Sequence, residues 1–312
     1  MLSWPLFRRG RKGLVGIEVR ANGLAVAVAE PAADGNRISR LDFIEAKAAQ
    51  RSTALKDYVN THKLEGMSCN LVLPPELYGW QQIERPPVED DELAQAVRWK
   101  IKDTLDYPID EAVVDAFEFP SDALRGKPPQ VNVISARKSL IKELIAMVNG
   151  SGLNLKAIDI TELALRNLVL GVQEEGKTVA LMIMQEHRGL MLLIKDGAVY
   201  LSRRIEADME GFDDPDISAR VGQQLALEIQ RSMDYFESQL GQTPPRSIIA
   251  SSIMHEAELL SRLDETLGLE IKTLPEDRLG IAEDQFVSAQ HWVACGAALR
   301  VTTKERSIHA AG

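Results

Sequence analysis

The residues best placed for chemistry lie in the stretch GLVGIEVRANGLAVAVAE, residues 13–30, where a carboxylate and a guanidinium precede a turn. Glu18 and Arg20 end the first of two alternating apolar runs, and Asn22-Gly23 separates the runs. Asn-Gly between such runs predicts a β-hairpin, because both residues tolerate a positive φ. Some nucleotide-binding folds hold a phosphate at a hairpin of this kind. The sequence therefore raises the question of whether a phosphate fits here.

Other catalytic or metal-binding patterns are absent from the sequence. The five histidines show neither HxxxH nor HExxH spacing, and no GxSxG elbow, Walker loop or dinucleotide fingerprint occurs. Cys69 and Cys295 lie far apart, with neither metal-ligand nor disulfide spacing. We therefore expect no catalytic residue and no metal site, and the cysteine usage fits a reducing cytoplasm.

Length and charge limit the possible functions further. The 312 residues are enough for two domains that each bury a core. A net charge of -10 argues against nucleic-acid binding, which needs concentrated Lys and Arg. The apolar runs are far shorter than the roughly 20 residues that a membrane span requires. A basic, flexible N-terminus is predicted at 1–12 (MLSWPLFRRGRK), either as a solvated tail or as a peripheral membrane contact.

Two halves of the chain show the same order of predicted elements. In each half, three strands are followed by a helix and a further strand, and the second half then adds a helix and a strand. The predicted ranges are strands at 14–20, 24–30, 37–46 and 67–73 with a helix from Ser52, and strands at 178–185, 189–195, 198–206, 247–250 and 269–274 with helices at 221–240 and 256–267. Such a repeat predicts two related α/β domains facing each other across a cleft, as in actin-like (ribonuclease H-like) folds.

A small α/β subdomain is predicted between the halves, at 80–130. Its helix follows Pro86-Pro87, has acidic residues at 89–92 in its first turn, and ends before Pro108. The apolar stripe of this helix is Leu93, Val97, Ile101 and Leu105. The first domain is then predicted at 13–79 and 131–160, the second at 161–302, and a flexible C-terminus at 303–312.

Four runs resemble the PilM family, the cytoplasmic actin-like proteins of type IV pilus assembly. The most specific is ELAQAVRWKIKDTLDYPIDEAVVD at 92–115. The others are LALEIQRSMDYF at 225–236, AIDITELA at 157–164 and GAALR at 296–300. The sequence of the inserted subdomain is most similar to the MshI branch, which serves the mannose-sensitive haemagglutinin (MSHA) pilus.

The resemblance implies a location and a partner. Similar proteins lie at the cytoplasmic face of the inner membrane and bind the short cytoplasmic tail of a single-pass PilN-like protein. We expect Arg98, Trp99 and Tyr107 of the inserted subdomain to contact that partner, because Trp99 lies off the apolar stripe and exposed aromatic residues anchor partners. A Trp99 that packs the subdomain onto the first domain is the alternative. Self-association is also possible for such a scaffold.

The resemblance also implies ATP and Mg²⁺ in most family members, held by two Asp-x-Gly phosphate loops. Glycine lets backbone amides approach the phosphates, and the carboxylate reaches Mg²⁺ through water. In this chain the first loop reads Glu18-Val-Arg20, and the second carries Ile183 and Gln185. Both loops have lost the glycine, and the second has lost the carboxylate.

The turn that faces the adenine in the family is also degenerate, because it carries Ser252 and Ile253 in place of glycine. We therefore predict a catalytically silent scaffold without a nucleotide cofactor. The alternative is a working ATPase of the same machinery that uses Glu18 in place of aspartate. A second alternative is a secretion-platform module like GspL, which shares the fold and the interaction role.

Overall fold

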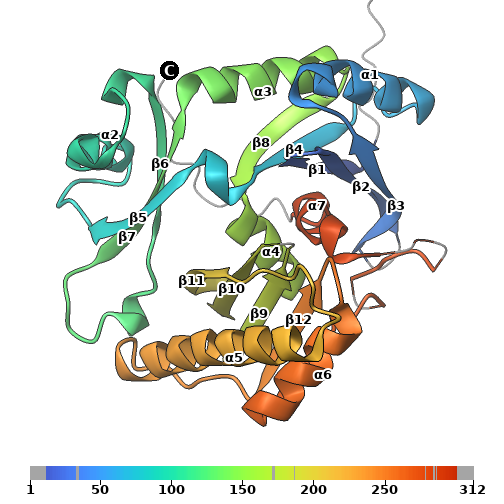
Figure 1. Ribbon diagram of the computed structural model, residues 1–312. Helices are drawn as coiled ribbons and strands as arrows, with labels where there is room; N and C mark the ends of the chain where they lie inside the picture. The colour runs from blue at the N-terminus through green and yellow to red at the C-terminus, as the bar shows by residue number, and fades with distance from the viewer. Residues whose placement is uncertain are drawn as a thin grey trace, which may run out of the picture.

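The computed structural model describes residues 12–300, except 33–34, 171–172, 186, 278, 284 and 286. The described chain forms two five-stranded sheets and one three-stranded sheet, with helices between and outside them (Figure 1). The predicted terminal segments at 1–12 and 303–312 lie outside the described residues, apart from Lys12. Within the described chain, no helix is both long and apolar enough to span a bilayer.

The first sheet has the strand order β3-β2-β1-β4-β8. Its strands are β1 (Leu14–Arg20), β2 (Gly23–Ala32), β3 (Gly35–Glu45), β4 (Ser68–Leu73) and β8 (Asn154–Ile160). The first three strands form an antiparallel meander, and the last two run parallel to β1. Two helices, α1 (Arg51–Thr61) and α3 (Lys138–Gly150), cover the outer face of the sheet (Figure 1) and bury apolar residues at helical spacing against it.

The second sheet repeats this arrangement with the order β11-β10-β9-β12-β13. Its strands are β9 (Thr178–Met184), β10 (Arg188–Lys195), β11 (Ala198–Glu206), β12 (Ser247–Ser252) and β13 (Glu270–Lys272). Its outer face is covered by α5 (Pro215–Ser238) and α6 (Glu256–Leu267) (Figure 1). The start of α5 is fixed by Asp214, whose side chain accepts hydrogen bonds from the backbone of Asp216 and Ile217.

The two sheets are joined through a buried layer of two helices. The layer consists of α4 (Thr161–Leu170) and α7 (Trp292–Ala298), which lie between the sheets (Figure 1). A Cβ atom at Gly296 would overlap the backbone of Ala164, and one at Gly16 would overlap Ala294. Glycine at these positions therefore allows α7 to pack directly on α4 and β1, which sets the relative position of the two domains.

The inserted subdomain contains the three-stranded sheet, with the order β5-β7-β6. Its elements are β5 (Gly79–Glu84), α2 (Leu93–Lys100), β6 (Ala112–Glu118) and β7 (Gln130–Arg137). α2 covers one face of this sheet and buries Leu93 and Val97 against Val131 and Val133. Six short 3₁₀ turns complete the described chain, at Ala48–Gln50, Pro75–Leu77, Lys102–Thr104, Ile109–Glu111, Ser121–Ala123 and Ala289–His291.

The predicted helix of the subdomain is wrong at both ends. α2 begins at Leu93, so the acidic residues at 89–92 precede the helix instead of forming its first turn. It ends at Lys100, well before Pro108, where the backbone tightens into the 3₁₀ turn Lys102–Thr104 and the Thr104 N–H donates to the Ile101 carbonyl at 2.9 Å. Leu105 therefore lies beyond the helix.

The β1–β2 turn occurs at the predicted place but has a different conformation. Neither Asn22 nor Gly23 has a positive φ, and Arg20 pairs directly with Gly23. Glycine is required at Gly23 for another reason, since a Cβ atom there would overlap the Ile44 carbonyl of the neighbouring strand. The turn is therefore shaped by close approach of β3.

Candidate functional site

The first candidate loop contains an enclosed carboxyl group. Glu18 is only 2% exposed, and its Oε2 lies 3.3 Å from Nη1 of Arg20. Burial raises the pKa of Glu18 to about 7, although the neighbouring Arg20 acts in the opposite direction. The group is therefore held inside the protein by its own arginine and does not face an open metal site.

Two further arginines restrict the phosphate-loop region. Nη2 of Arg51, at the start of α1, donates to the carbonyls of Arg20 and Ala21 at 2.5 and 3.1 Å. Arg188, at the start of β10, forms an ion pair with Glu76 in the segment that follows β4. This second pair joins the turn between β9 and β10 to the first domain.

The second candidate loop has an apolar side chain and an engaged backbone amide among its described residues. Ile183 is buried in the middle layer of the molecule, where an aspartate would be needed to assist a metal. The backbone N–H of Gln185 donates to the Arg188 carbonyl at 2.7 Å and closes the turn. The backbone amide of Gln185 is thus engaged within the turn.

The third candidate loop is closed by hydrogen bonds within the protein. Glu256 accepts from the Ser251 hydroxyl at 2.5 Å and from the Ser252 backbone N–H at 2.8 Å. The Ile253 N–H donates to the Met184 carbonyl at 3.0 Å, and Trp292 Nε1 donates to Ser251 at 3.0 Å. Glu256, Trp292 and the Met184 carbonyl therefore engage the polar groups of this turn.

Several groups that a magnesium nucleotide would use are buried or engaged in the described part of these loops. Such a ligand needs accessible carboxylates for Mg²⁺ and unpaired backbone amides for the phosphates. The carboxyl of Glu18 is buried, and the amides of Gln185, Ser252 and Ile253 are engaged. Among the described residues, no group of three or more His, Cys, Asp or Glu is arranged to hold a metal ion.

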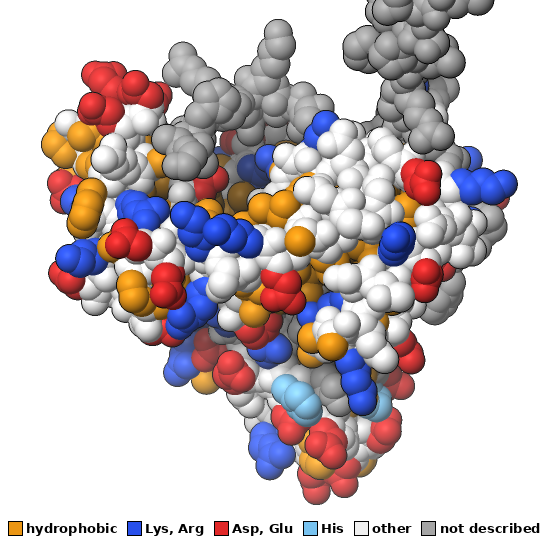
Figure 2. All heavy atoms as spheres, turned by 90° about the horizontal axis from the view of Figure 1, so that it is seen from above, with side chains coloured by type: hydrophobic (Ala, Val, Ile, Leu, Met, Phe, Trp, Pro, Cys, Tyr) orange, Lys and Arg blue, Asp and Glu red, His pale blue; other side chains and the backbone are white. Residues whose placement is uncertain are grey.

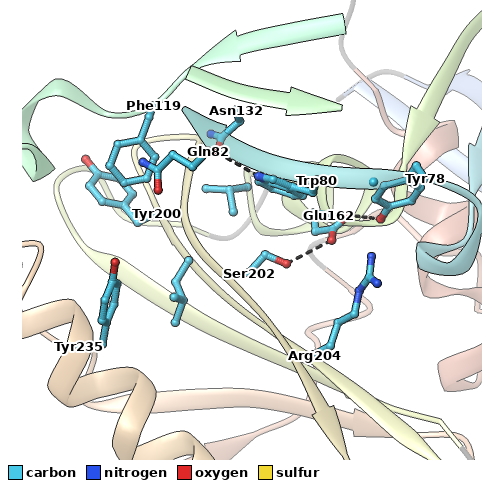
Figure 3. A pocket seen from close by; sticks show the side chains of 13 residues that line it. Tyr78, Trp80, Gln82, Phe119, Asn132, Glu162, Tyr200, Ser202, Arg204 and Tyr235 are labelled. Atoms are coloured by element: carbon cyan, nitrogen blue, oxygen red, sulfur yellow. Dashed lines mark hydrogen bonds between the residues drawn. The ribbon is translucent and has the colours of Figure 1, made fainter. Parts of the chain in front are cut away.

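A cavity of about 520 Å³ lies elsewhere, between the inserted subdomain and the second sheet (Figure 3). Side chains at alternate positions line it, as expected for strand faces. On the subdomain side these are Trp80 and Gln82 of β5, preceded by Tyr78 and joined by Asn132 of β7; on the other side they are Tyr200, Ser202 and Arg204 of β11. β5 and β11 are each at the edge of their sheets. We call this cavity the β5–β11 pocket.

One end of the β5–β11 pocket is polar. Glu162 of α4 accepts hydrogen bonds from the Tyr78 hydroxyl and, at 3.1 Å, from the Ser202 hydroxyl (Figure 3). Burial raises the pKa of Glu162, and burial together with the nearby carboxyl raises the pKa of Tyr78. Arg204 donates to the Pro75 carbonyl at 2.8 Å. These contacts tie the first domain to the second on one side of the pocket.

The other end of the pocket is aromatic. Phe119, in the loop that follows β6, contacts Tyr200 edge-on with ring centroids 6.5 Å apart. The Tyr200 hydroxyl donates to Asp122 at 2.7 Å, so this loop of the subdomain is fastened to the second domain. Tyr235 of α5 also lines this end and is 40% exposed. The pocket therefore offers ring surfaces to an apolar group.

The predicted partner residues lie on a different surface. Trp99 is 62% exposed on α2, which covers the face of the small sheet opposite to the pocket. Arg98 donates to the carbonyls of Ile109 and Ala112, and Arg137 lies 4.2 Å over the ring of Tyr107. Trp99 therefore does not pack the subdomain onto the first domain. Arg98 and Tyr107 are partly occupied by contacts within the subdomain.

The face seen from above mixes both signs of charge. Lys and Arg side chains lie among Asp and Glu and beside hydrophobic patches, including over the inserted subdomain at the left of the view (Figure 2). A broad basic surface for nucleic acid is not present on the part of this face that the structure describes.

Solved structures with a similar backbone identify the fold. A PilM-PilN type IV pilus biogenesis complex has a TM-score of 0.69 and 17% identity, covering 93% of this chain and 98% of the other. A Bacteroides thetaiotaomicron protein with an actin-like ATPase fold has a TM-score of 0.51 and 10% identity, covering 88% and 95%. The chain has an actin-like fold. The predicted fold class is confirmed, since its two domains carry the α/β sheets of that fold.

A further similar structure comes from a secretion system. The cytoplasmic domain of EpsL, an inner-membrane component of the type II secretion system of Vibrio cholerae, has a TM-score of 0.53 and 9% identity, covering 92% of this chain and 94% of the other. No protein-family model matches the chain, and a comparison by sequence with curated proteins finds no match either.

Sequence analysis missed the β5–β11 pocket of this actin-like fold. Its residues come from β5, β7, β11, α4 and α5, so no single run of sequence contains them. Two signals were nevertheless present, because Glu162 lies in AIDITELA and Tyr235 in LALEIQRSMDYF. Both runs carry the resemblance to the PilM family, and neither shows by its own pattern that it contributes to a pocket.

Proposed function

We propose that the chain is a cytoplasmic adaptor of a type IV pilus assembly platform, of the MSHA type, and that it acts at the inner face of the inner membrane. Its partner is the cytoplasmic tail of a PilN-like single-pass membrane protein. The observation that carries the proposal is the similarity to a PilM-PilN complex, which extends over 93% of this chain and 98% of the other.

The β5–β11 pocket is the proposed binding site for that tail. Two strand faces that contribute alternate side chains suit an extended segment, whose own side chains also alternate. Aromatic rings at one end provide apolar surface, and Glu162, Ser202 and Arg204 provide polar groups at the other. Aromatic residues that line a cavity are the usual anchors of an interface.

We also propose that the adaptor works without nucleotide. The enclosed Glu18, the buried Ile183 and the closed turn at Ser252 support this part of the proposal. The rival, an ATPase of the same machinery, requires these loops to open and Glu18 to reach a metal. A second candidate function, an equivalent adaptor in type II secretion, is supported by the similarity to EpsL.

Isothermal titration calorimetry tests these proposals. The purified chain is titrated with a synthetic peptide of the PilN-like tail from the same organism, with the tail of the type II secretion counterpart, and with Mg²⁺-ATP. We expect saturable binding of the first peptide, with a Kd on the order of micromolar, and only heat of dilution with nucleotide. Binding of Mg²⁺-ATP would favour the ATPase, and preference for the second peptide would favour the secretion role.

A further inference from the structure

A buried amide on the wall of the β5–β11 pocket has one half of its hydrogen-bonding capacity unused. Asn132 of β7 is 3% exposed, and its side chain lines the pocket (Figure 3). Its neighbours Val131 and Val133 point to the opposite face, into the core under α2. A polar residue thus stands at the one position of this stretch that faces the cavity.

Trp80 fixes the orientation of that amide. The indole Nε1–H donates to Oδ1 of Asn132 at 3.0 Å, and an indole N–H is only a donor, so the oxygen must be the partner. The Trp80 ring is itself held edge-on against Phe117, with centroids 5.7 Å apart. The Asn132 amide therefore cannot rotate by half a turn without losing this bond.

The nitrogen of the amide is consequently left without an acceptor. Nδ2 is buried and has no hydrogen-bond partner among the residues that the structure describes. Buried donors in folded proteins nearly always have a partner, so an exception calls for an explanation. Gln82, which pairs with Asn132 across the strands, adds a second amide on the same wall.

We propose that Asn132 determines how the bound segment is positioned, by donating Nδ2–H to a main-chain carbonyl oxygen of the extended tail. This inference rests on the proposed function, and it names the group of the partner that the site recognises. A main-chain carbonyl suits this position, because the side chains beside Asn132 on this wall, Trp80 and Gln82, are neutral.

The chemistry of this contact determines what is selected. A main-chain carbonyl is present in every residue. The contact with Asn132 therefore recognises the main chain of the tail and fixes how far the tail enters the pocket, and it does not depend on a particular side chain. The side chain next to that carbonyl is placed beside Phe119 and Tyr200, which favours an apolar group there. Specificity thus arises from one fixed hydrogen bond beside an aromatic wall.

The test combines side-chain amide NMR with calorimetry, using the tail peptide as the probe. The Asn132 Nδ2–H₂ resonances are assigned in protein labelled with ¹⁵N-asparagine by their loss in Asn132→Asp. We expect a downfield shift of one of them when the peptide binds. Asn132→Leu, which removes the donor at similar volume, is expected to weaken binding roughly tenfold.

Matched controls distinguish the role of Asn132 from the proposed binding of the tail. Asn60→Asp, on the exposed side of α1, is expected to leave the affinity unchanged, and thermal unfolding shows whether each variant is folded. Should Asn132→Leu bind as tightly as wild type while the Nδ2 resonances stay in place, the role of Asn132 is refuted and the proposed function stands. If the wild-type chain does not bind the peptide, both are refuted.

Discussion

The Glu76 carboxylate and the Arg188 guanidinium form an ion pair between the two domains of the actin-like fold, at the turn where a second phosphate loop would lie. The side chains are 40% and 48% exposed, so the pair adds little to stability, about 0 to 1 kcal/mol. Its importance lies in its place. It engages the guanidinium of Arg188 with the first domain, while the backbone N–H of Gln185 closes the turn.

The first prediction is that Mg²⁺-ATP does not stabilise the protein. A ligand that binds only the folded state raises the free energy of unfolding by about 2.7 kcal/mol at a hundredfold excess over its Kd. We expect no change in Tm in a thermal-shift assay with millimolar nucleotide, because the amides of the loops are engaged. The tail peptide serves as the positive control, and a clear rise in Tm with nucleotide contradicts the adaptor proposal.

The second prediction concerns Glu18 and pH. Its folded pKa of about 7 lies above its ordinary value of 4.5, so between these values the folded state holds a proton that the unfolded state has released. The free energy of unfolding of the wild type therefore falls as the pH rises from 4.5 to about 7. At about 1.4 kcal/mol per pKa unit, the loss is on the order of 3 kcal/mol.

Glu18→Gln removes this dependence, so its free energy of unfolding relative to wild type is expected to rise with pH. Urea denaturation at a series of pH values measures the difference. Glu45→Gln, which changes an exposed carboxyl, is the control and is expected to follow wild type. If the free energy of unfolding depends on pH in the same way for Glu18→Gln and wild type, Glu18 does not keep its proton in the folded state at these pH values.

Most of the fold could be predicted from sequence, because apolar periodicity is a local property. The helix predicted at 256–267 matches α6, and the predicted strands of the second half all occur within a few residues. Among the strands and α-helices of the described chain, five were not predicted, namely β5, α3, β8, α4 and α7. α7 (WVACGAA) is buried on every side, so it has no polar face to produce a helical period. β5 (GWQQIE) carries mainly polar residues and has no alternating apolar pattern, so its sequence does not predict a strand.

The candidate site was less predictable, because it depends on contacts between distant residues. The loss of glycine in the loops could be read directly, but the partners that close them, Arg51 and Glu256, could not. Glu162 and Asn132 are separated in sequence and line the same cavity because the subdomain packs onto the second domain through Phe119. No sequence pattern distinguishes a buried Asn132 from an exposed asparagine.

The third prediction is that Tyr78, Glu162 and Ser202 stabilise the domain arrangement as one unit. Tyr78→Phe removes a hydrogen bond to a buried carboxyl, which costs roughly 1 to 3 kcal/mol. Once Glu162→Gln has changed the acceptor, the same substitution is expected to cost less. Urea denaturation of both single variants and the double variant measures this coupling. Strictly additive free energies would mean that the hydroxyl and the carboxyl act independently.

The last prediction distinguishes the β5–β11 pocket from the surface around Trp99. Tyr235 and Leu227 are both on α5, with 40% and 50% of their surface exposed, but only Tyr235 lines the pocket. We expect Tyr235→Ala to weaken binding of the tail peptide roughly tenfold, as for an aromatic anchor, and Leu227→Ala to leave it unchanged. Neither substitution removes a core side chain, so both variants should keep the Tm of wild type.

Trp99→Ala belongs in the same series, because the sequence predicted Trp99, Arg98 and Tyr107 as partner contacts. Trp99 is on the side of the small sheet opposite to the pocket, so a tail bound in the pocket cannot touch it. Wild-type affinity in Trp99→Ala together with weak binding in Tyr235→Ala places the tail in the pocket. The reverse result moves the partner to α2 and removes the basis for a role of Asn132, which only a ligand inside the pocket can contact.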